Sequence, residues 1–404
     1  MNAQRWLSLR TALPVLAMVV FLMAWNRGIA LLYGMFALVV ATFMVGYLAP
    51  WWNLRGLRVS RSHPATVNAG EALPLRLTLS RQGRLKRYLI AATDRIPCAE
   101  PGEEAPMIFV ERVGRAVEVA FPVPCDWRGE HRLGPLAVET AFPLGIHRVR
   151  RDVPASTSSV LVYPAAREIP WFPGLAAAQA APSGGGRTAV AGGATEFMGV
   201  REYRRGDSPR HVHWGLSARR GELMVREFEF VSTAQVCLLL DLDAGAVHGE
   251  GRNSSFEHAV TVAAAVARYA LAQGHRVQLL GYGEQPVTVP PGHGESQLHR
   301  ILEALARVQP NGELPYRQAV LRAQGTIPPG STLVTFERAN RDGSPVEVLP
   351  LSSRVHPVRL LFDGYSYDYP LARSEPVAQQ PTARVPQYVL RHGDDPATVF
   401  RRPA

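Results

Sequence analysis

Arginines, acids and aromatic side chains are concentrated in one stretch of the chain, from Glu196 to Glu229. Seven arginines and six acidic residues share these 34 positions. The planar arginine side chain fits a carboxylate, so the stretch can form a fixed network of ion pairs. Arginines left unpaired would instead contact an acidic partner surface or a phosphate. A polynucleotide groove is disfavoured, because interleaved acids cancel the positive field that such a groove needs.

We call residues 195–230 the signature segment, and we predict that it is a structural clasp between a preceding linker and a following domain. The charged centre of the clasp is expected at Arg201, Asp207, Arg210 and Arg219. Trp214 would pack beneath these charges as an apolar anchor, which a purely solvated run of charges lacks. A docking surface for a partner protein is the alternative that stays open.

Two histidines in the signature segment suggest a catalytic alternative. On a strand, His211 and His213 would point to one face, where they could bind zinc together with Asp207. These three side chains, or the acidic pair Asp241 and Asp243, could perform metal-dependent or acid–base chemistry. No third His or Cys lies nearby, and the sequence holds no complete catalytic motif. We therefore expect an interaction protein rather than an enzyme, with no cofactor.

The order and spacing of the residues in this segment resemble the family called domain of unknown function 58. The hallmark of that family runs Glu-Phe, Arg-Glu-Tyr, Gly-Asp, Arg, Trp and Ser-Ala-Arg. The matching residues here are Glu196, Phe197, Arg201, Glu202, Tyr203, Gly206, Asp207, Arg210, Trp214, Ser217, Ala218 and Arg219. The resemblance extends to the N-terminal apolar region, to the β-rich part with Phe142–Ile146 and Val160–Pro164, and to the later α/β part.

The resemblance implies a membrane-tied protein whose α/β part is similar to a von Willebrand factor A domain. It also implies two partners: an ATPase of the MoxR type, from the AAA+ class, and a transglutaminase-like membrane protein. On this basis we expect a membrane-anchored adaptor that works with the ATPase in the assembly or quality control of an envelope complex. The resemblance supplies partners rather than a reaction.

A von Willebrand factor A domain binds a divalent cation through Asp-x-Ser-x-Ser after its first strand, and here the run is Asp241-Leu-Asp243-Ala-Gly245. Hard cations prefer several oxygen ligands. The oxygen-bearing side chains that could hold Mg²⁺ or Ca²⁺ in a degenerate site are Asp241, Asp243, Thr335 and Glu337. Gly245 offers no side-chain oxygen. The open alternative is an abandoned site in which loop amides donate to Asp241.

Several elements must position these residues, and the first is an apolar pair at the N-terminus. Thr11–Trp25 and Gly28–Ala49 carry no charge, which predicts a transmembrane helical hairpin over residues 1–54. A cleaved signal peptide would not be followed by a second, longer apolar run. Arginines precede and follow the hairpin and only Arg27 lies in its turn, so we expect a two-pass protein of the inner (cell) membrane with cytoplasmic soluble domains.

The soluble part changes its pattern at about residue 165. Over residues 55–165, apolar residues alternate with other residues, as from Leu73 to Leu79, which predicts a sandwich-like all-β domain. Residues 166–194 form an Ala/Gly-rich linker. Residues 231–370 alternate strands and helices, which predicts a doubly wound α/β sheet of the von Willebrand factor A type. Residues 371–404 are a Pro-rich tail.

Composition excludes several functions. The 404 residues carry a net charge of +10, and Lys86 is the only lysine, so a phosphate-binding P-loop and a Schiff-base enzyme are excluded. Arginines next to anionic lipid account for the positive charge without nucleic acid. The three cysteines are too few and too scattered for a zinc knuckle or a disulfide framework, which fits a reducing compartment or indifference to redox.

Overall fold

The computed structural model describes a large part of the chain. The described residues are 3–99, 105–154, 156–172, 175, 195–204, 209, 212–230, 235–340, 344–347, 349–370 and 385–400. The chain divides into two compact units, Met1–Pro164 and Ala165–Ala404. The described residues therefore include most of the predicted sites but few residues of the expected linker over 166–194.

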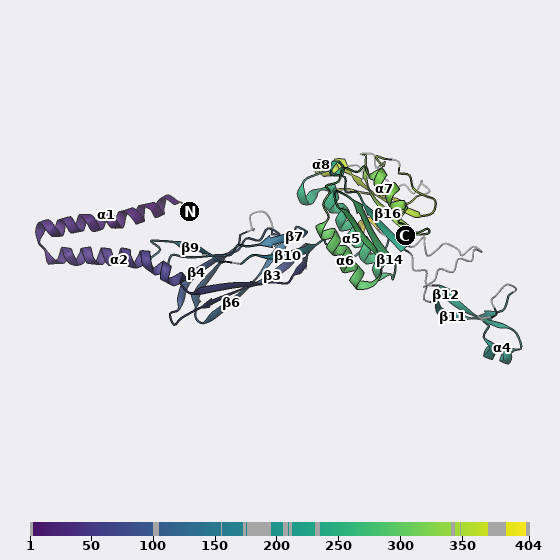
Figure 1. Cartoon of the computed structure of the whole chain (residues 1–404), viewed down its shortest axis with the longest axis horizontal. Helices are drawn as coiled ribbons and strands as arrows, with labels where there is room; N and C mark the ends of the chain where they lie inside the picture. Colours follow the sequence, from purple (N-terminus) through teal and green to yellow (C-terminus); the bar gives the residue numbers. More distant parts are fainter. Residues whose placement is uncertain are drawn as a thin grey trace. The chain divides into compact units, whose positions relative to one another are not determined.

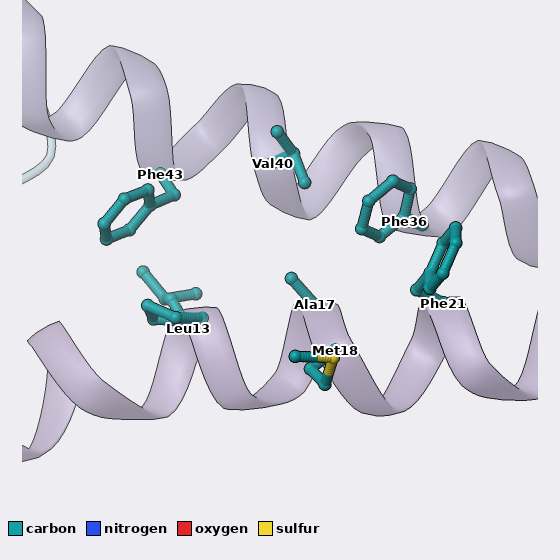
Figure 2. Close-up of a pocket in the computed structure, with 8 residues that line it drawn as sticks. Leu13, Ala17, Met18, Phe21, Phe36, Val40 and Phe43 are labelled. Carbon is teal, nitrogen blue, oxygen red and sulfur yellow. The ribbon is translucent and has the colours of Figure 1, made fainter.

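Two apolar helices begin the first unit: α1 (Ala3–Arg27) and α2 (Ala30–Leu54), with Gly28 at φ +62° between them. They run side by side (Figure 1), and the rings of Phe21 and Phe36 lie 5.1 Å apart. Apolar side chains of both helices line a cavity of about 380 Å³ (Figure 2). Among the described residues, only α2 is long and apolar enough to cross a membrane, because the apolar part of α1 is shorter.

The rest of the first unit consists of strands. They are β1 (Leu57–Ser62), β2 (Thr66–Asn68), β3 (Glu71–Arg81), β4 (Arg87–Thr93), β5 (Met107–Val113), β6 (Ala116–Cys125), β7 (Gly129–Leu133), β8 (Ala137–Thr140), β9 (Val149–Asp152) and β10 (Ser158–Tyr163). Three sheets result, with strand orders β1-β3-β6, β2-β10-β7 and β5-β4-β8-β9. Alternate residues of β3, from Leu73 to Leu79, are fully buried, as the period of two predicts.

The C-terminal end of α2 is bonded to the β strands. The Asn53 side-chain amide donates to the Tyr88 carbonyl oxygen (2.7 Å) and to Thr140 Oγ1 (3.0 Å), and its Oδ1 accepts from the Tyr88 N–H (3.1 Å). Arg151 donates to the carbonyl oxygens of Leu54 and Leu57. The last carbonyl groups of a helix lack intrahelical partners, so the bond from Arg151 to Leu54 caps α2. Together the Asn53 and Arg151 bonds fix α2 to the β domain.

Two cysteines meet in the core of this domain. Cys98 and Cys125 are fully buried, and their thiols are hydrogen-bonded to each other. The backbone supports the contact, because the Asp126 N–H donates to the Cys98 carbonyl oxygen at 3.1 Å. Both cysteines are free thiols in the structure. Burial and this hydrogen bond raise the pKa of the Cys125 thiol, which keeps it protonated.

The signature segment in the second unit contains an antiparallel strand pair, β11 (Thr195–Glu202) and β12 (Met224–Phe230), with the short helix α4 (Trp214–Arg220) between them. Gly221 ends α4 at φ +75°, where a side chain would be strained. The Ser217 hydroxyl donates to the His213 carbonyl oxygen and accepts from the Met224 N–H, which fastens α4 to β12.

A six-stranded sheet forms the main body of the second unit, in the order β15-β14-β13-β16-β17-β18. Its strands are β13 (Gln235–Leu240), β14 (Arg276–Tyr282), β15 (Pro286–Gly292), β16 (Thr332–Ala339), β17 (His356–Asp363) and β18 (Gln387–Leu390). All neighbours are parallel except β15, which runs antiparallel to β14 at the edge. Counting from β13, the order 3-2-1-4-5-6 is that of a doubly wound sheet.

Helices cover both faces of this sheet. They are α5 (Ser255–Ala272), α6 (Gly294–Arg307), α7 (Tyr316–Gln324), α8 (Gly364–Asp368) and α9 (Pro396–Val399). The helices α5 and α6 pack together, whereas α7 packs against Cys237 and Leu239 on the other face. The Ser254 hydroxyl accepts from the Glu257 N–H at 3.3 Å and starts α5, which is the geometry that the Ser-x-x-Glu spacing favours. The structure differs from the expected tail over 371–404, because this region supplies β18 and α9.

Candidate functional site

The doubly wound strand order indicates that a site is to be expected at the carboxyl ends of the strands of this sheet. The chain leaves β13 and β16 toward opposite sides of the sheet, and ligands in such folds bind outside the carboxyl ends of these strands. A pocket lies there, which we call the switch-point pocket because it is at the point where the strand order reverses. It is lined by Asp241, Asp243, Tyr316, Glu337, Arg338, Val346, Glu347 and Leu349. Its volume is about 10 Å³, which is room for about one water molecule. An organic substrate does not fit in it.

Asp241 occupies the end of β13 and accepts a hydrogen bond from the Asp243 N–H at 3.1 Å. Asp243 in turn accepts from the Gly245 N–H at 3.0 Å. Burial raises the pKa of Asp241 to about 7, because the surrounding protein disfavours the charged form. One loop amide, the Asp243 N–H, thus donates to Asp241, as the alternative of an abandoned site requires; whether the site is abandoned stays a prediction.

Glu337 is committed to an ion pair. Its buried carboxylate accepts from Arg359 Nε at 2.9 and 3.1 Å and from the same guanidinium's terminal nitrogen. Thr335 Oγ1 donates to Glu337 Oε1 at 2.5 Å. Two of the four predicted metal-binding side chains are thus bonded to each other and neutralised by Arg359.

The structure brings the predicted metal ligands to one edge of the sheet without giving them the character of a tight cation site. Among the residues that the structure describes, no group of three or more His, Cys, Asp or Glu side chains is placed to hold a metal ion. Gly245 offers no oxygen, Glu337 is paired, and Asp241 is readily protonated. This donor set does not fit the several free oxygen ligands that Mg²⁺ or Ca²⁺ requires. Weak binding stays a prediction.

Tyr316 and Glu347 of the pocket, and Arg359 beside it, were not predicted. Arg359 interrupts the apolar run of β17, and a charge inside a buried strand signals a buried partner, so this residue could have been found. The Tyr316 hydroxyl donates to the Leu239 carbonyl oxygen at 2.6 Å and ties α7 to β13. One oxygen of Glu347, Oε2, is buried and has no hydrogen-bond partner. No local pattern in the sequence marks Tyr316 or Glu347.

The predicted signature residues lie on and beside the strand pair. Arg201 and Glu202 are on β11, opposite Val225 and Met224 of β12. Ser217 is buried inside α4, and Ala218 and Arg219 are exposed on it. Gly206, Asp207 and Arg210 lie outside the described residues, so the centre of the predicted clasp stays a prediction.

Trp214 departs from the prediction. Its side chain, expected beneath the charges, is 67% exposed at the start of α4. The large apolar side chain of Leu223 is 48% exposed, and Tyr203 is also exposed. The segment is therefore not anchored by Trp214. The physical reason is local: Ser217 and Met224 form the buried contact between α4 and β12, and Trp214, the first residue of α4, stays outside this contact.

The histidine alternative is described only for His213. This residue precedes α4, and its Nδ1 accepts the Leu216 N–H at 3.2 Å, so the ring acts as the helix cap. His211 and Asp207 lie outside the described residues. The zinc site and the acid–base site built from these three residues thus stay predictions, and His213 already has a structural role.

A second polar group at the same edge of the sheet was not predicted. His248, after β13, lies 2.9 Å from Asp368 of α8, and the Gly249 N–H donates to the same carboxylate. His258 of α5 contacts the Tyr367 hydroxyl at 2.6 Å. These bonds join α5, α8 and the loop after β13. Histidines spread over many sequence positions gave no motif, so only the fold brings them together.

Comparison with known proteins gives limited matches. Among solved structures, the chain is similar to the CARDB domain of the PF1109 protein from Pyrococcus furiosus, with 11% identity over 26% of this chain and 94% of that one and a TM-score of 0.19. A β-glucosidase from Listeria innocua gives 16% identity over 26% of this chain and 16% of that one, with a TM-score of 0.17. These scores are too low to support an argument.

A curated relative and a family model match this chain in sequence. The uncharacterized protein YeaD of Bacillus subtilis (strain 168) is 23% identical over 305 residues, which cover 73% of each chain. Residues 199–326 match the model of the family described as protein of unknown function DUF58, and this match runs from β11 through the end of α7 into the region before β16.

Proposed function

We propose that the chain is a membrane-anchored interaction protein, with α1 and α2 crossing the membrane as a hairpin and the soluble domains in the cytoplasm. The length and apolar character of α2 support the anchor. Arginines on the flanks of the helix pair support the orientation, because positive residues favour the cytoplasmic side. The partner is a MoxR-type AAA+ ATPase, and a transglutaminase-like membrane protein is a further partner in the same envelope assembly.

The exposed side chain of Trp214 is the observation that carries this proposal. Trp, Tyr and Arg are the residues that most often dominate the binding energy of protein interfaces. The signature segment exposes four residues of these types, Tyr203, Trp214, Arg219 and Arg220, and the apolar Leu223. We call these five residues the docking face. An interaction role explains why a large aromatic side chain stays in solvent, whereas a structural clasp would bury it.

The α/β domain is a von Willebrand factor A-like domain in this proposal. Support comes from the strand order and from the antiparallel edge strand β15. The small pocket and the paired Glu337 favour a domain that binds proteins over one that turns over an organic substrate. Assembly or quality control of an envelope complex is the process in which such an adaptor would serve the ATPase.

Binding of the ATPase to the docking face can be tested with the purified full-length chain in detergent micelles. Trp214→Ala should weaken binding by at least about tenfold, the effect of losing an interface hot spot. Leu321→Ala on α7 is the matched control, because Leu321 is also a large apolar residue, 53% exposed. Calorimetric titration measures both. Equal affinity of the Trp214→Ala variant and the parent, or no binding by the parent, would contradict the proposal.

An enzyme is the second candidate, and a specific observation favours it. A carboxyl group whose pKa lies at about 7, as that of Asp241 does, can donate or accept a proton at neutral pH. In this case Asp241→Asn would abolish turnover without weakening ATPase binding. If the chain is an adaptor alone, it has no turnover, and Asp241→Asn leaves its affinity for the ATPase unchanged at neutral pH.

A further inference from the structure

The segment Ala141–His147, which is the loop between β8 and β9 apart from its last residue, Arg148, packs against the apolar helix α2. A Cβ atom placed on Gly46 of α2 would lie 2.6 Å from Ile146 Cδ1, so the loop approaches the helix as closely as the glycine permits. One position along the helix, the ring of Tyr47 stacks on His147 with the centroids 4.6 Å apart. The loop is therefore seated on α2 at the level of Gly46 and Tyr47.

This level lies within the apolar span of α2. Trp51 and Trp52 are 59% and 67% exposed, and tryptophans at a helix end mark the interface between membrane and water. Gly46 precedes Trp51 by five residues, which is about 7.5 Å along a helix axis in the direction of the bilayer. If α2 crosses the membrane, Ile146 and its loop reach the depth of the lipid headgroups or below.

The loop has the composition of a segment that enters this layer. Residues Ala141–His147 carry no acidic or arginine side chain, and Leu144 near the tip is 49% exposed. Arg148, which ends the loop, pairs with Glu139 of β8 at 3.2 Å. Phe142 stacks on Tyr88 of β4 with the ring centroids 5.3 Å apart, which supports the loop from behind. Leu144 is thus an apolar side chain held in solvent by a fixed loop.

The turn between β3 and β4 belongs to the same end of the domain. The Gln82 N–H at its start donates to the carbonyl oxygen of Gly56, just after α2. The turn exposes Leu85 between two basic residues, Arg84 and Lys86. Basic residues near a membrane surface are attracted to anionic headgroups. In an anionic leaflet, negatively charged headgroups lie next to hydrocarbon. An apolar side chain flanked by two cations complements both layers.

We propose that the loop Ala141–His147 is a membrane-contact wedge, whose Leu144 enters the interfacial layer of the anionic bilayer that α2 crosses. Arg84 and Lys86 bind the phosphate groups of the same leaflet. The wedge rests on the proposed membrane anchoring. Asn53 and Arg151 bond the end of α2 to the strands and so form a first attachment of the β domain to the membrane. The wedge is a second attachment, which holds the β domain against the lipid surface.

Spin labels on the full-length chain in phosphatidylcholine–phosphatidylglycerol vesicles test the wedge. The native cysteines are all buried, so single variants Leu144→Cys, Leu38→Cys and Glu71→Cys can be labelled selectively. Leu38 reports on α2, where it is exposed. Glu71 reports on the far end of β3, about 33 Å from Arg81 for ten residues of strand. Power saturation compares the accessibility of each label to oxygen, which enters lipid, and to a nickel chelate, which does not.

We expect the labels at positions 144 and 38 to favour oxygen and the label at position 71 to favour nickel. Replacing Arg84 and Lys86 by glutamate should shift the label at position 144 toward nickel and leave the label at position 38 unchanged. If position 38 favours oxygen while position 144 behaves like position 71, the wedge is wrong and the anchor stands. If position 38 favours nickel, the anchoring itself is wrong, and the wedge with it.

Discussion

At the scale of single residues, the pair Glu337–Arg359 determines what the switch-point pocket can do. The sequence identifies Asp241, Asp243, Thr335 and Glu337 as oxygen-bearing side chains at strand ends, and the fold brings them together. The sequence does not reveal that Glu337 pairs with Arg359, because the two residues lie on neighbouring strands whose register only the sheet defines. A buried pair of this kind removes one carboxylate from the ligands available to a cation.

Removal of Arg359 should destabilise the second unit strongly. Arg359→Met leaves the buried Glu337 carboxylate without its cation, and breaking a buried pair costs about 3 to 5 kcal/mol. Glu303→Ala is the control, because the pair Arg307–Glu303 is exposed on α6, and exposed pairs contribute about 0 to 1 kcal/mol. Urea unfolding of the full-length chain in detergent measures both variants. Equal free energies of unfolding for Arg359→Met and the parent would show that the pair does not stabilise the fold.

At the scale of elements, the regular patterns of the sequence predict most of the second unit. Apolar runs mark β13 and β17, and the Ser254–Glu257 capping box marks α5. Short elements escape prediction: β18 has four residues, α4 has seven, and neither is long enough to show a period. Trp214 was misjudged for a related reason, because composition suggests an apolar anchor but does not reveal which face of a short helix is covered.

The junction between α5 and α8 should make stability depend on pH. Burial lowers the pKa of His258 to about 4, from the ordinary value of 6.5, and Asp394 and His392 are charged or titratable neighbours of its ring. Between these two pH values the unfolded chain binds the proton and the folded chain does not, so stability is full above pH 6.5 and falls as the pH decreases toward 4.

The variant His258→Gln should lose less thermal stability than the parent between pH 7 and pH 4.5, by several degrees in Tm. Glutamine keeps a polar group for the Tyr367 hydroxyl but does not titrate. His299→Gln, at an exposed position of α6, serves as the control and should follow the parent. Melting curves at a series of pH values give the comparison, and parallel curves for His258→Gln and the parent would refute the assignment.

At the scale of the whole molecule, the two units meet different physical demands. The first combines α2 and the strands into one bonded body through Asn53 and Arg151, so any membrane that holds α2 also fixes the β domain. The second presents the switch-point pocket and the docking face. The β-strand alternation and the strand–helix alternation could be predicted from the sequence because both are periodic. The attachment of α2 to the strands by Asn53 and Arg151 could not, since these residues act across 35 and 97 sequence positions.

Because Cys98 and Cys125 are in contact, their oxidation state depends on the compartment in which the chain folds. Two thiols in hydrogen-bonding contact are close to the arrangement of a disulfide, so an oxidising compartment would join them, while Cys237 is buried in the core of the other unit. With the soluble domains in the cytoplasm, cells quenched in acid, denatured and treated with a maleimide polymer should yield a chain with three labelled cysteines. Export of the domain would join Cys98 to Cys125 and leave one label, on Cys237. The variant Cys125→Ser cannot form this disulfide and would carry two labels whichever side of the membrane the domain is on. The number of labels on one electrophoresis band thus reports the orientation of the hairpin without any fusion partner.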